Sequence, residues 1–200
     1  ELTRQVTACL RQNKTIGFVP TMGALHAGHA SLVQRACPEN EVCFVSVFVN
    51  PTQFNNSEDL LRYPRDLEKD AKLLELLGVH FVFAPTPEEM YSKEEMESSF
   101  MFDFNGLDEM MEGKMRPGHF NGVVQVVSIL FDLVQPTRAY FGEKDFQQLA
   151  IIRYLVERSP LANRYKGIKI IGCPIVREES GLAMSSRNER LSSKEKQIAV

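Results

Sequence analysis

A short apolar run, a turn of small residues and a pair of histidines constrain this chain most strongly. Residues 16–19 are apolar and end at Pro20, and the following turn carries His26 and His29 into a segment that favours a helix. This order is typical of a strand, a tight loop and a helix. We expect the helix to begin near Leu25.

The start of a helix is a natural site for an anion. Its first N–H groups have no partners within the helix, and the helix dipole is positive there. His26 and His29 are spaced to share one face of such a helix, so both imidazoles can donate hydrogen bonds to phosphate. Alternatively, the histidines only cap the helix or pack against it. A zinc site would need further His or Cys ligands, and the neighbouring sequence offers none.

Composition excludes several classes of protein. The chain has 200 residues, 44% hydrophobic and 24% charged, with a net charge of −3. These values are typical of a globular domain with a substantial core, and they do not favour a nucleic-acid or membrane surface as the main partner. The four cysteines show no metal-ligand spacing, so we expect reduced thiols and a cytoplasmic protein.

The ends of the chain suggest a piece of a longer protein. It begins at Glu1 and ends at Val200 within a helical pattern. We find no signal peptide and no apolar run long enough to span a membrane. We therefore expect a fragment trimmed at both ends.

Strands and helices are predicted to alternate along the chain. Pro38 is expected to end the helix that follows the histidines, and Gly78 the helix that ends at residue 77. The methionines of residues 110–115 are expected to serve in packing. The expected strands are residues 16–19, 42–49, 79–84, 100–104, 139–141 and 168–173, and the expected helices are residues 2–10, 30–36, 60–77, 123–134, 146–158 and 192–200.

This alternation predicts an α/β fold with a mostly parallel sheet and right-handed crossovers. Ligands of such sheets bind outside the carboxyl ends of the strands. Three polar clusters, residues 21–29, 50–54 and 142–148, follow strand ends. We expect them to converge on one cleft.

The polar clusters carry complementary chemistry. Lys144 can reach phosphate as a point charge, whereas Asn50, Gln53 and Gln148 offer neutral amides that can grip a carboxylate or hydroxyl. Ordinary turn chemistry and solvation are the alternatives. Residues 184–188 (Met-Ser-Ser-Arg-Asn) add hydroxyls and a guanidinium suited to a polyphosphate. The tripeptide Ser-Ser-Arg also occurs in many solvated loops.

Six motifs in sequence order closely resemble the pantoate–β-alanine ligase family, over residues 15–191. They are Pro-Thr-Met-Gly-Ala-Leu-His and the following His at residues 20–29, Phe-Val-Asn-Pro-Thr-Gln-Phe at 48–54, Tyr-Pro-Arg at 63–65, Arg-Pro-Gly-His-Phe at 116–120, Gly-Glu-Lys-Asp at 142–145, and Met-Ser-Ser-Arg-Asn at 184–188.

The resemblance implies a Rossmann-like nucleotidyltransferase domain of the His-x-Gly-His type, with helices on both faces of the sheet and an architecture related to class I aminoacyl-tRNA synthetases. It places an ATP- and pantoate-binding domain at residues 1–175 and the start of a smaller C-terminal domain at 176–200, the lid domain being largely absent from this chain. Full turnover is in question without that lid, because closure keeps water from a reactive acyl adenylate.

The implied reaction has two steps. The carboxylate of pantoate attacks the α-phosphorus of ATP to form pantoyl adenylate and pyrophosphate, and β-alanine then displaces AMP to give pantothenate. The expected partners are these small molecules, Mg²⁺ and a second copy of the chain in a homodimer, with neither nucleic acid nor membrane.

The resemblance also assigns residues. The catalytic group comprises His26, His29, Lys144 and Arg187, with His29 matching the usual proton donor. Gln53 and Gln148 match the pantoate-binding glutamines, Asn50, Arg116 and His119 accompany them, and Asp70 is the expected magnesium contact. The matching ATP contacts are Met22, Gly23, Ala24, Leu25, His26, Ala27, Gly28, His29, Gly142, Glu143, Lys144, Asp145, Val176, Met184, Ser185, Ser186 and Arg187.

Two other functions remain open at this level. Another nucleotidyltransferase of the His-x-Gly-His type would share the histidine turn and the sheet. In that case Gln53 and Gln148 would not face the phosphate site. A nucleotide-binding or regulatory module without catalysis would bind ATP but release no pyrophosphate when pantoate is added.

Overall fold

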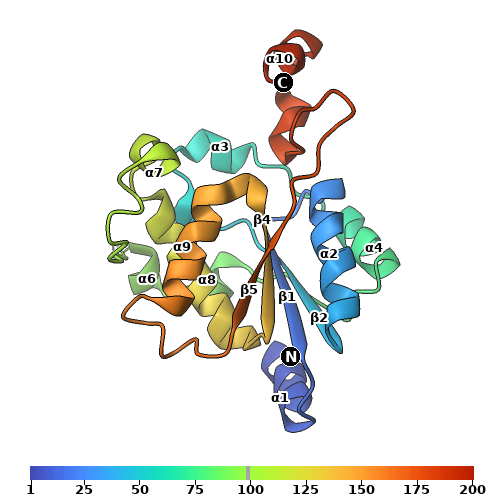
Figure 1. Cartoon of the computed structure of the whole chain (residues 1–200), viewed down its shortest axis with the longest axis vertical. Helices are drawn as coiled ribbons and strands as arrows, with labels where there is room; N and C mark the ends of the chain where they lie inside the picture. Colours follow the sequence, from blue (N-terminus) through green and yellow to red (C-terminus); the bar gives the residue numbers. More distant parts are fainter. Residues whose placement is uncertain (98–99) are drawn as a thin grey trace.

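The structure is a computed structural model that describes residues 1–97 and 100–200. At its centre lies a parallel sheet of five strands in the order β3-β2-β1-β4-β5, with helices on both faces (Figure 1). The predicted α/β class with a parallel sheet is confirmed. The strands are β1 (Ile16–Thr21), β2 (Val42–Val47), β3 (Phe81–Phe83), β4 (Arg138–Gly142) and β5 (Lys169–Cys173).

The order of the strands reverses next to β1. The chain starts at β1, builds outward through β2 to β3, and then returns to place β4 on the other side of β1. There Gly17 pairs with Arg138 and Phe18 with Ala139. A crevice forms at the carboxyl ends of the strands where successive connections leave in opposite directions. The fold therefore places a cleft above β1 and β4.

Successive side chains of the strands enter two different cores. Phe18 packs with α1 (Leu2–Arg11), α8 (His119–Val134) and α9 (Phe146–Glu157). Val19 packs on the opposite face with α2 (Ala27–Glu39) and α4 (Leu67–Leu76). Because a strand alternates its side chains and both faces are covered, the central strands are mostly apolar.

Among the helix boundaries that differ from the sequence predictions, two have a local cause that involves proline. The helix expected at residues 60–77 is divided into α3 (Ser57–Leu61) and α4, because Pro64 interrupts it and Asp66 caps α4 by accepting a hydrogen bond from the Lys69 N–H at 3.0 Å. Helix α2 continues through Pro38 to Glu39. Since this proline lies in the last turn, the helix tolerates it and ends one residue later.

The expected strand at residues 100–104 is wrong, because this segment has no strand pairing. It is held instead by a hydrogen bond from the Phe102 N–H to the Asn121 side chain at 2.9 Å and by ring contacts of Phe102 with Phe104 and Tyr154. Hydrophobicity alone could not distinguish this aromatic packing from a buried strand.

The packing role expected of the methionine-rich segment is also wrong. Helix α7 (Met111–Met115) exposes the side chains of Met111 and Met115, and Met110 just before it is exposed as well.

Shorter elements complete the described chain. They are η1 (Pro51–Gln53), α5 (Pro87–Met90), α6 (Lys93–Glu97), η2 (Glu143–Asp145), η3 (Ser186–Arg190) and α10 (Ser193–Ile198). After β5 the chain leaves the sheet, and η3 and α10 project from the main body (Figure 1). Among the described residues, no helix is long and apolar enough to cross a membrane.

A matched pair of leucines in α4 tests this packing. Leu74 is fully buried against the α2 face of the sheet, whereas Leu76 is 85% exposed. We expect Leu74→Ala to lower the free energy of unfolding by about 2 to 5 kcal/mol. Leu76→Ala should change it by less than about 0.5 kcal/mol. Denaturation in guanidinium chloride measures both, and equal losses would contradict the assigned orientation of α4.

Candidate active site

The turn between β1 and α2 is held by a buried carboxylate. Asp70, 3% exposed, accepts hydrogen bonds from the N–H groups of Ala24 and Leu25 at 2.9 and 2.8 Å. Gly23 and Ala24 both have positive φ angles, and a Cβ on Gly23 would lie only 2.9 Å from the Asp70 carboxylate. The turn therefore requires glycine at position 23 and a short acceptor beneath it.

The two histidines cap the helix that follows. Helix α2 begins at Ala27, two residues later than predicted, with His26 as its N-cap. The Nδ1 atom of His26 accepts a hydrogen bond from the Gly28 N–H at 3.1 Å, and the Nδ1 atom of His29 accepts one from the His26 N–H at 3.4 Å. Because each Nδ1 is an acceptor, each neutral ring carries its proton on Nε2. Both interpretations of the histidines, as caps and as donors, are therefore compatible.

His29 is neutral in this environment. Burial, followed by the neighbouring His26 and Lys144, lowers its pKa from 6.5 to about 3, against an opposing effect of Asp145. The centres of the two histidine rings lie 4.1 Å apart. A neutral His29 can donate one hydrogen bond from Nε2 while adding no charge to the site.

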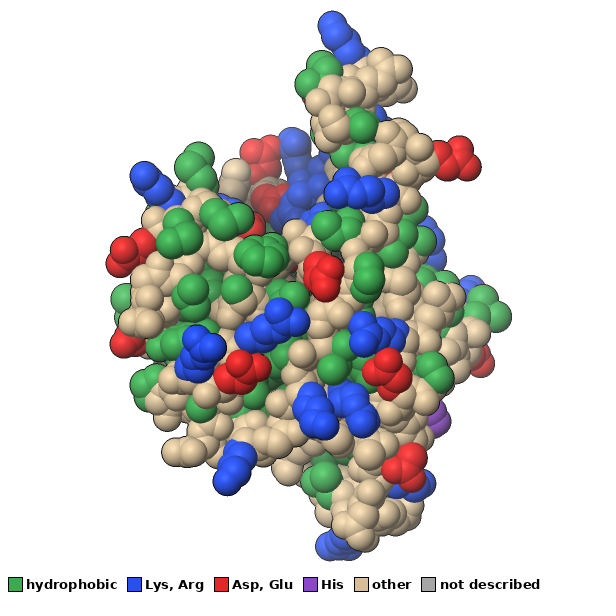
Figure 2. Space-filling model, in the orientation of Figure 1, with side chains coloured by type: hydrophobic (Ala, Val, Ile, Leu, Met, Phe, Trp, Pro, Cys, Tyr) green, Lys and Arg blue, Asp and Glu red, His purple; other side chains and the backbone are tan. Residues whose placement is uncertain are grey.

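A polar cavity of about 280 Å³ lies in front of the histidines. Lys144 reaches it from η2, where its Nζ lies 3.0 Å from the Asp145 carboxylate, and Arg187 reaches it from η3. Figure 2 shows Lys and Arg side chains gathered in the recess beneath the projecting C-terminal segment. The remaining lining residues are Met22, His26, His29, Gln53, Phe54, Tyr63, Glu112, Arg116, His119, Asp145, Gln148, Met184, Ser185 and Ser186.

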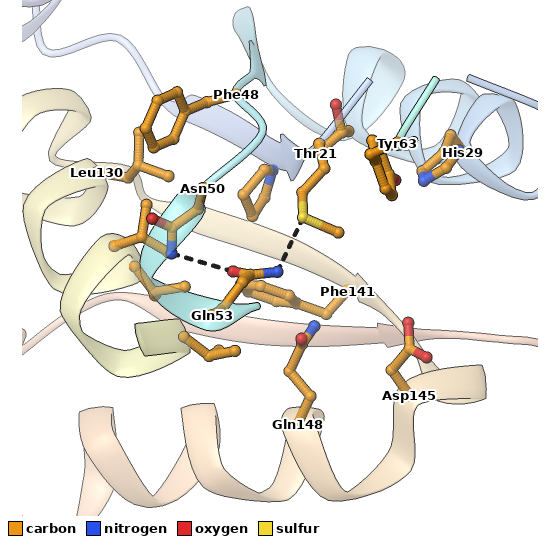
Figure 3. A pocket seen from close by; sticks show the side chains of 15 residues that line it. Thr21, His29, Phe48, Asn50, Gln53, Tyr63, Leu130, Phe141, Asp145 and Gln148 are labelled. Carbon is orange, nitrogen blue, oxygen red and sulfur yellow. Dashed lines mark hydrogen bonds between the residues drawn. The ribbon is translucent and has the colours of Figure 1, made fainter. Parts of the chain in front are cut away.

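A second cavity of about 140 Å³ adjoins the first. The two share lining residues, among them His29, Gln53 and Gln148, so they form one cleft. Gln53 and Gln148 extend into this cavity from different elements, η1 and α9 (Figure 3). The predicted convergence of the three polar clusters is confirmed. The apolar part of the wall comes from α8 and β4 and comprises Val123, Val126, Val127, Leu130 and Phe141.

A relay of amides fixes the orientation of Gln53. Asn50 donates from Nδ2 to the Gly122 carbonyl at 3.1 Å and to Gln53 Oε1 at 3.2 Å, while its Oδ1 accepts from the Tyr91 hydroxyl at 2.7 Å. Gln53 is therefore held with its NH₂ group toward Met22, whose sulfur lies 2.8 Å away (Figure 3). A thioether is a weak acceptor, so this NH₂ group is available to a carboxylate.

Arg116 and His119 also hold Gln53 in place. The main-chain carbonyl of Gln53 accepts hydrogen bonds from His119 Nδ1 at 2.8 Å and from Arg116 Nη2 at 3.4 Å. Burial is the main cause that lowers the pKa of His119. Position 122 requires glycine, because the backbone of Gly122 packs against η1. A Cβ there would lie 2.4 Å from the Thr52 carbonyl oxygen.

Several predicted site residues use their polar atoms to hold other parts of the protein. Asp70, the predicted magnesium contact, uses both oxygens to hold the histidine turn, and Val176 accepts the Met184 N–H at 3.0 Å. Asn50 lines the smaller cavity but uses its amide atoms on protein partners. Among the described residues no group of three or more His, Cys, Asp or Glu side chains is arranged to hold a metal ion.

The structure adds residues that the motif analysis did not assign. Tyr63 is buried and lines both cavities, with its ring edge-on to Phe54. Gln147 anchors α7 and the segment before it. Its side chain forms hydrogen bonds with the backbone of Leu107, Met110 and Gly113. The Tyr-Pro-Arg motif at residues 63–65 was the available signal for Tyr63. Gln147 had none, since its partners are distant in sequence.

Comparison with known proteins identifies the family of this chain. The profile of the pantoate–β-alanine ligase family matches residues 1–200. The chain belongs to this family of ligases. Pantothenate synthetase from Phocaeicola vulgatus is 58% identical over 200 residues, which are 100% of this chain and 68% of the relative.

Solved structures of the family have the same fold. Pantothenate synthetase from Thermus thermophilus superposes with a TM-score of 0.87 at 48% identity, over 98% of this chain and 68% of that one. Pantoate–β-alanine ligase from Francisella tularensis, described as a complex with β-γ ATP and β-alanine, gives 0.83 at 40% identity, over 98% of this chain and 74% of that one.

The neutral state of His29 predicts a dependence of stability on pH. The pKa of the His29 side chain is about 3 in the folded protein, whereas its ordinary value, which applies to the unfolded chain, is 6.5. Between these two pH values the unfolded chain therefore binds one more proton at this residue than the folded protein does. We expect the free energy of unfolding to fall as the pH decreases from 7 to 5. Urea denaturation at pH 7, 6 and 5 measures this slope.

The variant His29→Asn is the control for that measurement, because it removes the titrating ring. Its stability should fall less steeply over the same range, with His119 contributing what remains. Equal slopes for the variant and the wild-type chain would exclude a buried neutral His29. Most carboxylates titrate below this window and interfere little.

Proposed function

We propose that this chain catalyses the ATP-dependent condensation of pantoate with β-alanine through a pantoyl adenylate, releasing pyrophosphate and AMP. One observation carries the proposal. A cavity lined by phosphate-binding groups opens directly into one lined by neutral amides, and His29, Gln53 and Gln148 belong to both. This is the arrangement needed to bring a carboxylate to the α-phosphorus of ATP.

In the first step a carboxylate oxygen of pantoate bonds to the α-phosphorus, and the bond to pyrophosphate breaks. Negative charge grows on the phosphate oxygens as pyrophosphate leaves, so fixed donors there lower the barrier. His26 and His29 supply Nε2–H donors whose tautomers are set by the backbone of α2. Lys144 and Arg187 supply positive charge, and Ser185 and Ser186 supply hydroxyls.

Neutral amides suit the carboxylate of pantoate. A paired guanidinium would draw charge from the attacking oxygen, whereas the NH₂ groups of Gln53 and Gln148 orient it and leave it nucleophilic. The apolar wall from α8 faces the same space and fits the branched carbon skeleton of pantoate. In the second step the amine of β-alanine attacks the acyl carbon near Gln53, and AMP leaves.

Magnesium enters this scheme with ATP. Mg²⁺ is usually held by substrate phosphates, waters and one or two carboxylates, and it does not require a cage of protein ligands. It would neutralise charge on the phosphates. Asp145 lines both cavities and would be available to such an ion, whereas the contact of Asp70 remains a prediction.

The domain boundary near residue 175, the homodimer and the cytoplasmic location are proposed on the family resemblance. The departure of the chain from the sheet after Cys173 supports that boundary. Gln53 and Gln148 line the polar cavity. This position disfavours the alternative of another His-x-Gly-His nucleotidyltransferase, in which these glutamines would not face the phosphate site.

Release of pyrophosphate tests the proposed reaction. With ATP and Mg²⁺, we expect release from this 200-residue chain only when pantoate is added. A coupled pyrophosphatase assay measures the rate, and the adenylate can be identified by mass spectrometry. ATP binding without pyrophosphate release on adding pantoate, in this chain and in a version extended at its C-terminus, would favour the non-catalytic alternative.

His29→Ala is the internal control for this assay. Loss of one donor to a developing phosphate charge typically reduces the rate by about 10² to 10³. The far-UV circular dichroism spectrum should remain that of the wild-type chain. A near wild-type rate of release would remove His29 from the mechanism.

A substitution at Gln53 tests the division of the cleft. We expect Gln53→Ala to raise the KM for pantoate by about 10- to 100-fold, because a hydrogen bond to a charged carboxylate is lost. The KM for ATP should change by less than about threefold. Initial-rate kinetics with each substrate varied in turn give both values. Equal losses for pantoate and ATP would contradict the assignment.

A further inference from the structure

Arg187 is held in the wall of the polar cavity by a carboxylate from a distant segment. Its Nη2 atom lies 2.7 Å from Asp59 Oδ2, and Arg190 places Nη1 2.7 Å from the other oxygen, Oδ1. Asp59 belongs to α3, and both arginines belong to η3. The two arginines thus occupy both oxygens of one carboxylate.

Three further contacts join the same segments. The guanidinium of Arg187 lies 5.5 Å from the centre of the Tyr63 ring, and the Tyr63 hydroxyl lies 3.3 Å from Ser186 Oγ. Arg190 also donates to the Arg62 carbonyl at 2.9 Å. Residues 59–63 therefore fix the loop 185–190 from one side, and Figure 1 shows η3 and α10 projecting from the body above that side.

The pairing leaves most of Arg187 available to a ligand. A guanidinium has five N–H donors, and the bond to Asp59 uses one of them at Nη2. The side chain of Arg187 is 42% exposed and lines the cavity together with His29 and Lys144. Asp59 can therefore retain its contact while the other donors of Arg187 face a phosphate.

Arg190 keeps the carboxylate paired when Arg187 engages a phosphate. The Asp59 side chain is 27% exposed, so a carboxylate left without either arginine would be a poorly solvated charge. The hydrogen bond from Arg187 is the main cause that holds the pKa of Asp59 below its usual value, and Arg190 adds to it. The carboxylate is thus charged at neutral pH and can act on both arginines.

We propose that Asp59 is a positioning residue for ATP, which orients Arg187 toward the phosphates while Arg190 balances its charge. This role rests on the ATP assignment of the proposed function. The opposite role is also physically possible, because a carboxylate can compete with phosphate for Arg187. The free donors of Arg187 and the second arginine favour positioning over competition.

A double-mutant cycle on ATP binding tests the role, with dissociation constants measured by isothermal titration calorimetry of the 200-residue chain. We expect Asp59→Asn to weaken ATP binding about tenfold, and Arg187→Gln to weaken it at least as much. In the double variant, Asp59→Asn should add no further loss, because it acts through Arg187.

Two variants serve as controls. Glu58→Gln removes the neighbouring carboxylate of α3, which pairs with Arg62 on the exposed surface, and should leave ATP binding unchanged. Asp59→Glu retains the charge and should recover part of the lost affinity. Thermal unfolding of each variant separates loss of folding from loss of binding.

The outcomes separate this role from the proposed function. Unchanged or tighter ATP binding by Asp59→Asn would overturn the positioning role, and tighter binding would indicate competition. An additive loss in the double variant would also overturn it, because Asp59 would then act independently of Arg187. Failure of the wild-type chain to bind ATP would instead overturn the proposed function, and the role of Asp59 with it.

Discussion

The carboxylate of Asp70 holds the turn on which the site depends. Its two oxygens accept the N–H groups of Ala24 and Leu25, where the chain reverses between β1 and α2. These backbone donors would otherwise be buried without partners, which is costly. With the turn fixed, α2 starts at Ala27 and its first residues place His26 and His29 side by side. A buried contact outside the cleft thus determines the position of the donors inside it.

The cationic side chains and the orienting amides of the cleft come from different segments of the chain. Lys144 and Arg187 enter from η2 and η3, at the side where a polyphosphate would lie. Gln53 enters from η1, oriented by Asn50 and supported through its carbonyl by His119. Each set relies on supporting residues that set the direction of the contacting group. Such preorganisation removes the cost of reorienting dipoles during the reaction.

The histidines show how burial adjusts the chemistry of the site. Burial keeps His29 neutral, and its Nδ1 accepts a backbone N–H, so Nε2 is left as the donor. The positive charge of the cleft then comes from Lys144, Arg116 and Arg187. A second carboxylate, Asp59, holds Arg187 from outside the cleft. Asp70 and Asp59 therefore have related structural roles, because each holds a segment that contributes side chains to the polar cavity.

The class of fold and the motifs of the cleft could be predicted from the order of the amino acids. Apolar runs of strand length, alternating with helical periodicity, predicted the parallel sheet, and Gly23, His26, His29, Gln53, Lys144 and Arg187 were recognisable because each lies in a short local motif. Tertiary structure alone decided which of these groups contact each other. It placed Asp70 beneath the histidine turn, Asp59 against Arg187, and Asn50 behind Gln53, and it left residues 100–104 outside the sheet. The reason is physical: periodicity records which face of a segment is buried, whereas the partner of a polar group depends on where distant segments meet.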